Sequence, residues 1–316
     1  MITSDLSIIR ERLIQGDLIG LPTETVYGLA ANVFNSNAVS AIFETKNRPT
    51  SNPLIVHVAS LSHARALVNH FPEKAEQLAQ VFWPGPLTLI LPKNKSVSQL
   101  VTANQPNVAI RVPNHPTTLS LLNQLDFPLV APSANPFNRI SPTTAEHVDG
   151  YFPSIYTLDG GACKAGVEST IVGFEGDEVV LLRHGAISIE AIEAQVGRIL
   201  NRTSPSADAT LPGQHKKHYA PSCELIVTYE PLFMLSAVKH KKIGILWYKA
   251  VKIKSLQVDV NLVLSPTGDL EIAAKNLFAT LHTMDRMGLD LIIVERLPAH
   301  DLGVTINDRL DRAATK

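Results

Sequence analysis

Residues 44–58, ETKNRPTSNPLIVHV, join the end of a predicted helix to an apolar strand, the succession from which α/β folds are built. Pro49 disfavours helical geometry at the residue before it, so we expect the helix to end in front of it. Lys46 and Arg48 then lie where the helix gives way to a loop. From this stretch alone, two interpretations of these cations stay open: a solvated helix end, or side chains that hold an anion.

The same succession recurs through the first 200 residues. Apolar runs such as LTLILP (87–92) and NVAIRVP (107–113) alternate with helical patterns such as EKAEQLAQVF (73–82) and SIEAIEAQVGRIL (188–200). Mixed strands and helices in this order predict an α/β domain with a large twisted mixed sheet and flanking helices. We assign this domain to residues 1–200.

Residues 201–222, NRTSPSADATLPGQHKKHYAPS, have a different character. Ser, Thr, Pro and Gly dominate and no apolar period survives, so the stretch is predicted to be a linker. Beyond it, residues 223–316 return to alternating strands and helices with short connections. This pattern predicts a small, doubly wound, Rossmann-like domain. It has no GxGxxG motif, so we do not infer dinucleotide binding from it.

The composition narrows the class of protein. Of the 316 residues, 45% are hydrophobic and 18% charged, and the formal net charge is −1, so any polyanion site must be a local patch. Two distant cysteines without CxxC spacing argue against a disulfide framework or a zinc site and fit a reducing compartment. Neither a signal peptide nor an apolar run of about 18 residues is present, so we expect a cytoplasmic protein with no membrane span.

Polar side chains gather at predicted strand ends, where ligands bind in open α/β sheets. The sequence lacks GxxxxGK[ST], HExxH and GxSxG motifs, and the Gly-rich stretch GGACKAG (160–166) is more typical of a turn. Taken singly, the clusters have ordinary structural explanations, such as a helix cap at Thr25 or an Asx turn at Asn135. Together they supply cations and hydroxyls without a matching set of carboxylates, which predicts a cavity for phosphates and a carboxylate. The residues are Lys46, Arg48, Arg111 and Arg183 with Thr25, Ser133, Asn135, Ser141, Ser169 and Thr170.

The order of these motifs resembles the YrdC-type family of L-threonylcarbamoyl-AMP synthases. The motifs are LPTETVYGLAA (21–31), KNRPTSNPLIVHV (46–58), FWPGPLTLIL (82–91), VAIRVP (108–113), PSAN and SPT (132–143), DGG and GVESTIV (159–172) and LLRHGAIS (181–188). The linker PGQHKKHYAPS (212–222) and the domain after it resemble the longer, two-domain branch of that family. The resemblance therefore covers essentially the whole chain.

The resemblance implies a nucleotidyl transfer. The family combines L-threonine, bicarbonate and ATP into L-threonylcarbamoyl-AMP and releases pyrophosphate. A partner enzyme system then transfers the threonylcarbamoyl group to adenosine 37 of tRNAs, giving N6-threonylcarbamoyladenosine. The resemblance further implies Mg²⁺ that enters with ATP, no tightly bound metal ligated by the protein, a monomer, and at most weak binding of tRNA itself.

The resemblance also implies roles for individual residues. The family's Lys-x-Arg and Ser-x-Asn signature falls on Lys46, Arg48, Ser133 and Asn135, which would carry catalysis. The threonine pocket would comprise Thr25, His57, Arg111, Ala131 and Ser169, although His57 taken alone is more typical of a core histidine on a strand. ATP would contact Arg48, Asn52, Asn107, Ser133, Ser141, Arg183 and Tyr219, and the linker that holds Tyr219 would act as a lid.

Three positions depart from the family pattern. Asn138 stands where the family usually has Gly, Asn107 where Thr is frequent, and His184 where Pro is frequent. Asn tolerates positive φ, so the turn at Asn138 is expected to survive.

Two other functions are alternatives. An RNA-binding module would use HKKH (215–218) and KHKK (239–242), but the net charge and the missing aromatic signature weigh against it. A carbamoyl-transfer relative of the hydrogenase-maturation type would need zinc-finger and acylphosphatase domains that this chain lacks.

Overall fold

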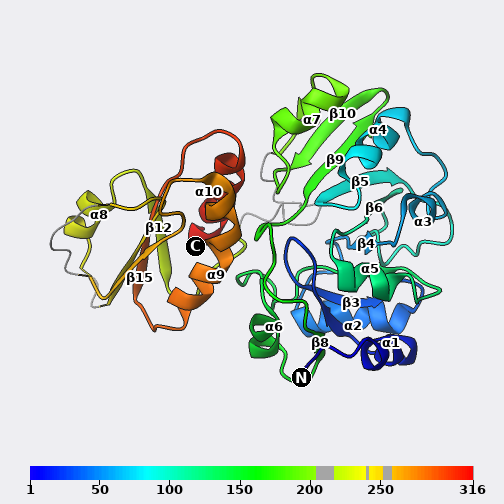
Figure 1. Ribbon diagram of the computed structural model, residues 1–316, viewed down its shortest axis with the longest axis horizontal. Helices are drawn as coiled ribbons and strands as arrows, with labels where there is room; N and C mark the ends of the chain where they lie inside the picture. The colour runs from blue at the N-terminus through cyan, green and yellow to red at the C-terminus, as the bar shows by residue number, and fades with distance from the viewer. Residues whose placement is uncertain (204–216, 240–241, 252–257, 316) are drawn as a thin grey trace.

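A computed structural model describes residues 1–203, 217–239, 242–251 and 258–315 of the chain. These residues form an eleven-stranded mixed sheet and a four-stranded parallel sheet, each with its own helices (Figure 1). The strands of the large sheet all fall within the first 201 residues and those of the small sheet beyond residue 223. The predicted α/β fold with a second Rossmann-like domain is confirmed.

The large sheet has the strand order β1-β8-β2-β3-β7-β4-β6-β5-β9-β10-β11. Its strands are β1 (Ile2–Thr3), β2 (Ile19–Leu21), β3 (Gly28–Asn32), β4 (Ile55–His57), β5 (Leu87–Pro92), β6 (Asn107–Arg111), β7 (Leu129–Val130), β8 (Tyr156–Leu158), β9 (Thr170–Glu175), β10 (Glu178–Arg183) and β11 (Leu200–Asn201). Helices in this part are α1 (Leu6–Gln15), α2 (Ser36–Lys46), α3 (Leu61–Arg65), α4 (Glu73–Phe82), α5 (Pro116–Leu122), α6 (Ala145–Tyr151) and α7 (Ile189–Val196).

Helix α2 and strand β4 contain the stretch that joins helix to strand. Asn35 caps the helix by accepting from the backbone N–H groups of residues 37 and 38, and Asn47 ends it in the left-handed region at φ 51°. The helix thus stops at Lys46, ahead of Pro49, as predicted. It buries Val39, Ile42 and Phe43 against the sheet, so the end of the helix, and the cations on it, have a fixed position.

Parallel pairing of β4 with β6 brings two predicted site residues together. His57 and Arg111 are register partners at the carboxyl ends of these strands. Strand β9 runs parallel to β5, and its first residue, Thr170, follows Ser169 at the same region of the sheet. The carboxyl ends of parallel strands are where open α/β sheets place ligands.

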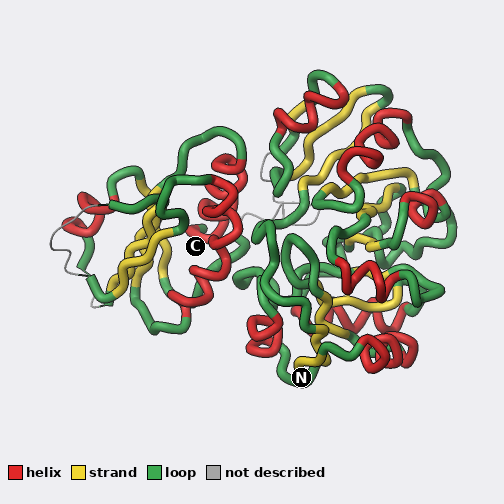
Figure 2. The backbone as a smooth tube through the Cα atoms, in the orientation of Figure 1, coloured by secondary structure: helices red, strands yellow, loops and turns green. Residues whose placement is uncertain are grey.

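The small domain packs helices on both faces of its parallel sheet, β12-β15-β13-β14. Its elements are β12 (Glu224–Thr228), α8 (Pro231–Ala237), β13 (Ile243–Trp247), β14 (Val260–Val263), α9 (Leu270–Asp285), β15 (Leu291–Glu295) and α10 (Leu302–Ala314). Helices α9 and α10 lie on the face toward the large domain and α8 lies on the outer face (Figure 1). Loops of the large domain, more than its helices, meet α9 and α10 (Figure 2).

Several boundaries differ from the prediction. Strand β7 is only two residues long, because Pro132 follows closely and Ser133 forms a single bridge to Gly28. Helix α3 ends at Arg65, and α10 begins at Leu302, earlier than its apolar period indicates. The predicted linker begins inside β11, which pairs with β10, and its residues 204–216 lie outside the described part of the chain.

Candidate active site

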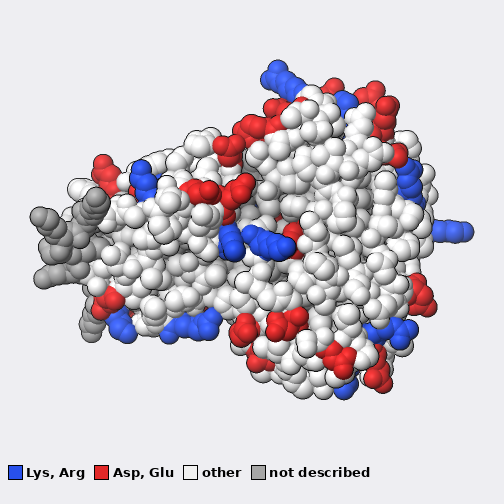
Figure 3. All heavy atoms as spheres, viewed as in Figure 1, with Lys and Arg blue, Asp and Glu red and all other residues white. Residues whose placement is uncertain are grey.

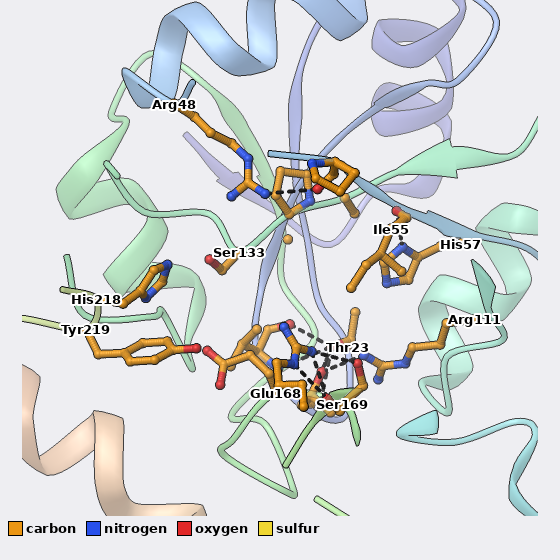
Figure 4. A pocket seen from close by; sticks show the side chains of 17 residues that line it. Thr23, Arg48, Ile55, His57, Arg111, Ser133, Glu168, Ser169, His218 and Tyr219 are labelled. Carbon is orange, nitrogen blue, oxygen red and sulfur yellow. Dashed lines mark hydrogen bonds between the residues drawn. The ribbon is translucent and has the colours of Figure 1, made fainter. Parts of the chain in front are cut away.

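A cavity of about 60 Å³ lies where the large domain meets the small one, beyond the carboxyl ends of β4 and β6 (Figure 4). Nine of the predicted site residues line it: Thr25, Arg48, His57, Arg111, Ala131, Ser133, Ser169, Arg183 and Tyr219. Thr23, Glu168 and His218 line it as well. Residues from seven separate stretches of the chain thus converge on one cavity.

Arg48 enters the cavity from the end of α2. Its Nε donates to the carbonyl of Asn52 at 3.3 Å and its Nη2 to the carbonyl of Pro53 at 3.0 Å. No carboxylate among the described residues forms an ion pair with this guanidinium. Burial, and then the nearby Arg183 cation, lower the pKa of Arg48 to about 9. An anion bound between the two guanidinium groups would offset both costs.

Arg183 closes the other side of the cavity from the end of β10. Its Nη2 donates to the carbonyl of Ser169 at 2.7 Å and to the Ser169 hydroxyl at 3.0 Å. That hydroxyl also lies 2.7 Å from the hydroxyl of Thr88. Burial lowers the pKa of Arg183 to about 10. These contacts fix the direction of the guanidinium before any ligand binds, as anion sites in enzymes require.

Arg111 has an acidic partner that sequence reasoning did not supply. Its Nη2 lies 2.6 Å from Oε1 of Glu24, with an alignment that pairs the charges but forms no hydrogen bond. Its Nη1 donates to the hydroxyl of Thr25 at 2.9 Å and its Nε to the carbonyl of Gly85. The expectation that this region lacks matching carboxylates is therefore wrong: Glu24 and Glu168 both lie in it.

His57 faces the cavity as a neutral imidazole. Burial, and then the charge of its strand neighbour Arg111, lower its pKa to about 3. Nδ1 lies 3.2 Å from the carbonyl of Ile55. A neutral ring can receive or donate a hydrogen bond without adding charge to the pocket, so the cations there are the three arginines.

Comparison with known proteins agrees with this geometry. A family model described as telomere recombination, spanning Sua5, YciO and YrdC, matches residues 11–185, and a model described as the C-terminal domain of threonylcarbamoyl-AMP synthase matches residues 187–315. The threonylcarbamoyl-AMP synthase of Pyrococcus abyssi is 40% identical over 318 residues, covering 95% of this chain and 91% of that protein. The chain belongs to the threonylcarbamoyl-AMP synthase family.

Further relatives extend the match. The threonylcarbamoyl-AMP synthase of Bacillus subtilis is 39% identical over 314 residues, covering 95% of this chain and 90% of that protein. The crystal structure of P. abyssi Sua5 complexed with L-threonine superposes with a TM-score of 0.90 at 37% identity, covering 98% of this chain and 94% of that one. Full-length HypF, 16% identical with a TM-score of 0.52 over 58% of this chain and 29% of that one, shares the fold alone. The chain is an enzyme of the adenylyl-transfer type that this family represents.

Lys46 does not line the cavity. Its ammonium donates to the carbonyl of Ser133 at 2.5 Å and to that of Asn135. Burial and the neighbouring Arg48 lower its pKa well below the usual value. The side-chain amide of Asn135 donates to the carbonyls of Pro136 and Arg139, also away from the cavity. Lys46 and Asn135 thus hold the loop that presents Ser133.

Three predicted ATP contacts lie outside the cavity lining. Asn52 is fully buried behind Arg48, and its side-chain amide has no partner among the described residues. Ser141 is buried and donates to Oε1 of Glu168 at 2.8 Å. Asn107 is exposed at the opposite end of β6 from Arg111, in a separate hollow over β5 and β9. Because a strand rises about 3.3 Å per residue, Asn107 lies too far from the cavity to share its ligand, and we leave it out of the site.

The turn at Asn138, where the chain departs from the family pattern, has the expected backbone conformation. Asn138 has φ 68°, as expected for an Asn in place of Gly, and its carbonyl accepts from the N–H of Ala220 at 2.8 Å.

Tyr219, near the described end of the linker, is 1% exposed, and its ring centre lies 5.3 Å from that of Phe278. Burial raises the pKa of its hydroxyl to about 12. The described end of the linker therefore packs between the two domains.

Sequence reasoning gave no role to two acids and a histidine at the site. Glu24 stands only as one of the polar residues after a predicted strand, Glu168 lies in a motif of which only the hydroxyl residues receive a role, and His218 precedes Tyr219. The usable signal for Glu24 was the need of a buried strand-end arginine for an anionic partner. No group of three or more His, Cys, Asp or Glu side chains that could hold a metal occurs in the described ranges, and no helix there is long and apolar enough to cross a bilayer.

Proposed function

We propose that this chain joins L-threonine, bicarbonate and ATP into L-threonylcarbamoyl-AMP, with release of pyrophosphate and water, in the cavity between its domains. The observation that carries the proposal is the convergence of Arg48, Arg111 and Arg183 on that cavity in a chain of this family. Anionic reactants repel each other, and fixed cations offset that repulsion.

The reaction asks mainly for positioning. The amine of threonine attacks the carbon of bicarbonate, water leaves, and a carbamate forms. A carbamate oxygen then attacks the α-phosphorus of ATP, and pyrophosphate departs with the electrons of the broken P–O bond. No covalent bond to the protein is required, which fits a cavity lined by arginines and hydroxyls rather than by an activated nucleophile.

The arginines have distinct environments, which suggests a division of labour. Arg111 pairs with Glu24 and Thr25, yet each of its Nη atoms carries a second N–H that can bind the threonine carboxylate. Arg48 and Arg183, whose pKa values are lowered by burial, suit the phosphates of ATP. Ser133 and Ser169 would donate hydroxyls from opposite walls, and Thr25, His57 and Ala131 would line the amino-acid side.

Admission of the substrates requires the cavity to enlarge. Ligand sites commonly occupy roughly 300–1,000 Å³, whereas this cavity measures about 60 Å³. His218 and Tyr219 line it from the linker, whereas the other described lining residues belong to the large domain. We therefore place the lid at these residues. Mg²⁺ would enter with the ATP phosphates, and Asn52 and Ser141 would support the nucleotide side from behind the wall.

The product suits transfer in the cytoplasm to a nucleophilic nitrogen of a tRNA base by a separate transferase. Direct RNA binding by this chain gains no support: on the face that Figure 3 displays, acidic and basic side chains are interspersed without one broad basic area. The two basic clusters named above include residues outside the described ranges.

Purified protein incubated with ATP, bicarbonate and threonine tests the proposal. Pyrophosphate release is expected only when all three are present, and omission of each in turn is the control. Serine in place of threonine measures how far the side chain contributes. Pyrophosphate release that does not depend on threonine would falsify the proposal.

A further inference from the structure

Helix α10 of the small domain reaches the wall of the cavity through Arg309. The Arg309 side chain has no exposed surface. Its Nε donates to Oε2 of Glu168 at 2.8 Å, and its Nη2 donates to the carbonyl of His184 at 2.6 Å. Glu168 lines the cavity directly (Figure 4). A residue 141 positions away in sequence thus fixes a carboxylate in the active site.

Glu168 has both oxygens engaged. Oε1 accepts from the hydroxyl of Ser141 at 2.8 Å and Oε2 accepts from Arg309. Two further groups interact electrostatically with it, Arg183 at the end of β10 and Tyr219 of the linker, and Asp308 acts in turn on Arg309. A negative charge at this point faces a pocket proposed to hold a triphosphate and two carboxylates, so it must be neutralised if it is not to repel them.

The same face of α10 also holds the loop after β10. Thr305 donates its hydroxyl to the carbonyl of Gly185 at 2.9 Å, next to the carbonyl of His184 that Arg309 binds. The N–H of Ala186 donates in turn to the carbonyl of Glu168 at 3.0 Å. This loop begins directly after Arg183, so α10 holds two adjoining walls of the cavity at once.

Simple attachment of the two domains would not need these contacts. Arg139 of the large domain pairs with Asp285 of α9 at 2.9 Å and also contacts Ser222, away from the cavity. That pair joins the domains without touching a lining residue. The pair of Arg309 with Glu168 is buried, with side chains 0% and 9% exposed, and buried pairs of this kind are weak contributors to stability compared with apolar packing. A role in the site explains better why it is there.

We propose that Arg309 is a positioning residue for the reaction: it neutralises Glu168 and aligns that carboxylate with Ser141, so that the cavity accepts anionic substrates. The inference rests on the proposed function. It gives the small domain a specific part in the chemistry, through a guanidinium that itself touches no substrate. Arg309 also lies 5.4 Å from the ring centre of Tyr219, so the same cation supports the lid residue.

Full-length protein carrying Arg309→Met, Glu168→Gln or both tests the inference. Methionine fills similar space without charge, and Asp308 keeps Arg312 as its partner. We expect Arg309→Met to lower kcat/KM for ATP by roughly tenfold or more, because it leaves a buried carboxylate unpaired. Adding Glu168→Gln is expected to restore most of the loss, since the uncharged amide needs no cation. Arg309→Lys is expected to retain part of the activity.

The pH profile separates this role from packing. A carboxylate buried without its cation keeps its proton to higher pH, and the protonated form repels no anion. The activity ratio of Arg309→Met to the parent should therefore rise as the pH is lowered. In the double variant the ratio should not change with pH. Asp285→Asn, which breaks the other interdomain pair, is the matched control and should leave both kcat and KM within about twofold.

Each outcome either supports or overturns the inference about Arg309. Unchanged kinetics in Arg309→Met would overturn the inference. So would a double variant whose loss of kcat/KM equals the product of the two single losses, together with an activity ratio of Arg309→Met to the parent that does not change with pH. If Arg309→Met does not fold but the double variant folds and turns over, the inference stands; if neither folds, Arg309 serves packing alone and the inference is lost. An inactive parent protein would instead refute the proposed function, which the parent arm reports independently of the variants.

Discussion

At the scale of single residues, Arg48 most clearly supports the proposal that the site binds an anion. It is buried, its hydrogen bonds go to two carbonyls, and its nearest charged neighbour is another cation. Holding a cation in this way costs free energy, which a bound polyanion would offset. Function rather than stability therefore explains its position.

Replacement of Arg48 by Met should separate these two contributions. We expect turnover to fall by roughly 100-fold or more, the scale on which a preorganised oxyanion contact contributes. The melting temperature should hold or rise, because an uncompensated buried cation is removed. Arg10→Met, on the exposed face of α1 where Arg10 bonds the carbonyl of Gln124, is the control. Near-parental pyrophosphate release by the Arg48 variant would argue against a phosphate clamp.

Sequence reasoning at this scale grouped residues that line one cavity, but it did not predict the contacts that buried side chains make with the protein itself. The motif pattern grouped Arg48, Arg111 and Arg183, and the structure brings them to one cavity. It also grouped Lys46 with them, but the Lys46 ammonium turns to backbone carbonyls. Which neighbour a buried side chain chooses depends on loop geometry that spacing along the chain does not encode.

At the scale of elements, the loop between β10 and α7 depends on Gly185. A Cβ placed there would lie 2.2 Å from the nitrogen of Thr170 and 2.3 Å from the carbonyl carbon of Ser169. Backbone atoms of a central strand cannot move away as a flexible side chain would. The close approach therefore fixes Arg183 relative to Ser169.

Gly185→Ala should push this loop outward. We expect a loss of roughly 1–3 kcal/mol in the free energy of unfolding, typical of overpacking, together with reduced turnover as Arg183 shifts. Gly150→Ala in α6 is the control, since a Cβ there meets nothing within 4 Å, and alanine in a helix should stabilise by up to about 1 kcal/mol. Denaturant melts of both variants measure this; equal stabilities would contradict the account of the loop.

Helices α6 and α9 meet through a pair of stacked histidines. The rings of His147 and His282 lie 3.8 Å apart and nearly parallel, and Nε2 of His282 lies 3.1 Å from the carbonyl of Ser141. Burial, and then the neighbouring His147, lower the pKa of His282 from 6.5 to about 3. The interface therefore needs a neutral ring.

The stability of the protein should accordingly fall as the pH drops through this histidine's ordinary pKa. Between about pH 6.5 and about pH 3, His282 is protonated in the unfolded chain but neutral in the folded chain. Lowering the pH through this range therefore favours the unfolded chain. His282 should contribute at most about 2 kcal/mol of this loss at a pH near 5. His282→Phe keeps a stacked ring without titration, and its melting temperature should vary less with pH than that of the parent or of the exposed-site control His63→Gln. Identical slopes would remove His282 from the explanation.

Elements with a clear period and capping residues were predictable from sequence. Helix α2 ends ahead of Pro49 as predicted, and the alternation beyond residue 223 folds as a parallel sheet. Short strands were not: β7 stops at Val130, and β11 extends into the first residue of the predicted linker. Their pairing depends on partners far along the chain, which apolar runs do not reveal.

At the scale of the whole molecule, the small domain contacts residues that line the cavity of the large one. Tyr219 packs on Phe278 of α9, and Arg309 of α10 holds Glu168. Sequence reasoning separated the two domains but gave the second no role. The contacts that give it one join residues more than a hundred positions apart, so only the folded chain displays them.

The central claim is that this cavity makes L-threonylcarbamoyl-AMP. Mass spectrometry of a reaction containing carbon-13 bicarbonate, threonine and ATP tests it most directly. We predict an adduct that holds AMP, threonine and one labelled carbon, formed in equal amount with pyrophosphate and strongly reduced in the Arg48→Met variant. Pyrophosphate without the labelled adduct, or an unlabelled adenylate of threonine itself, would contradict the account.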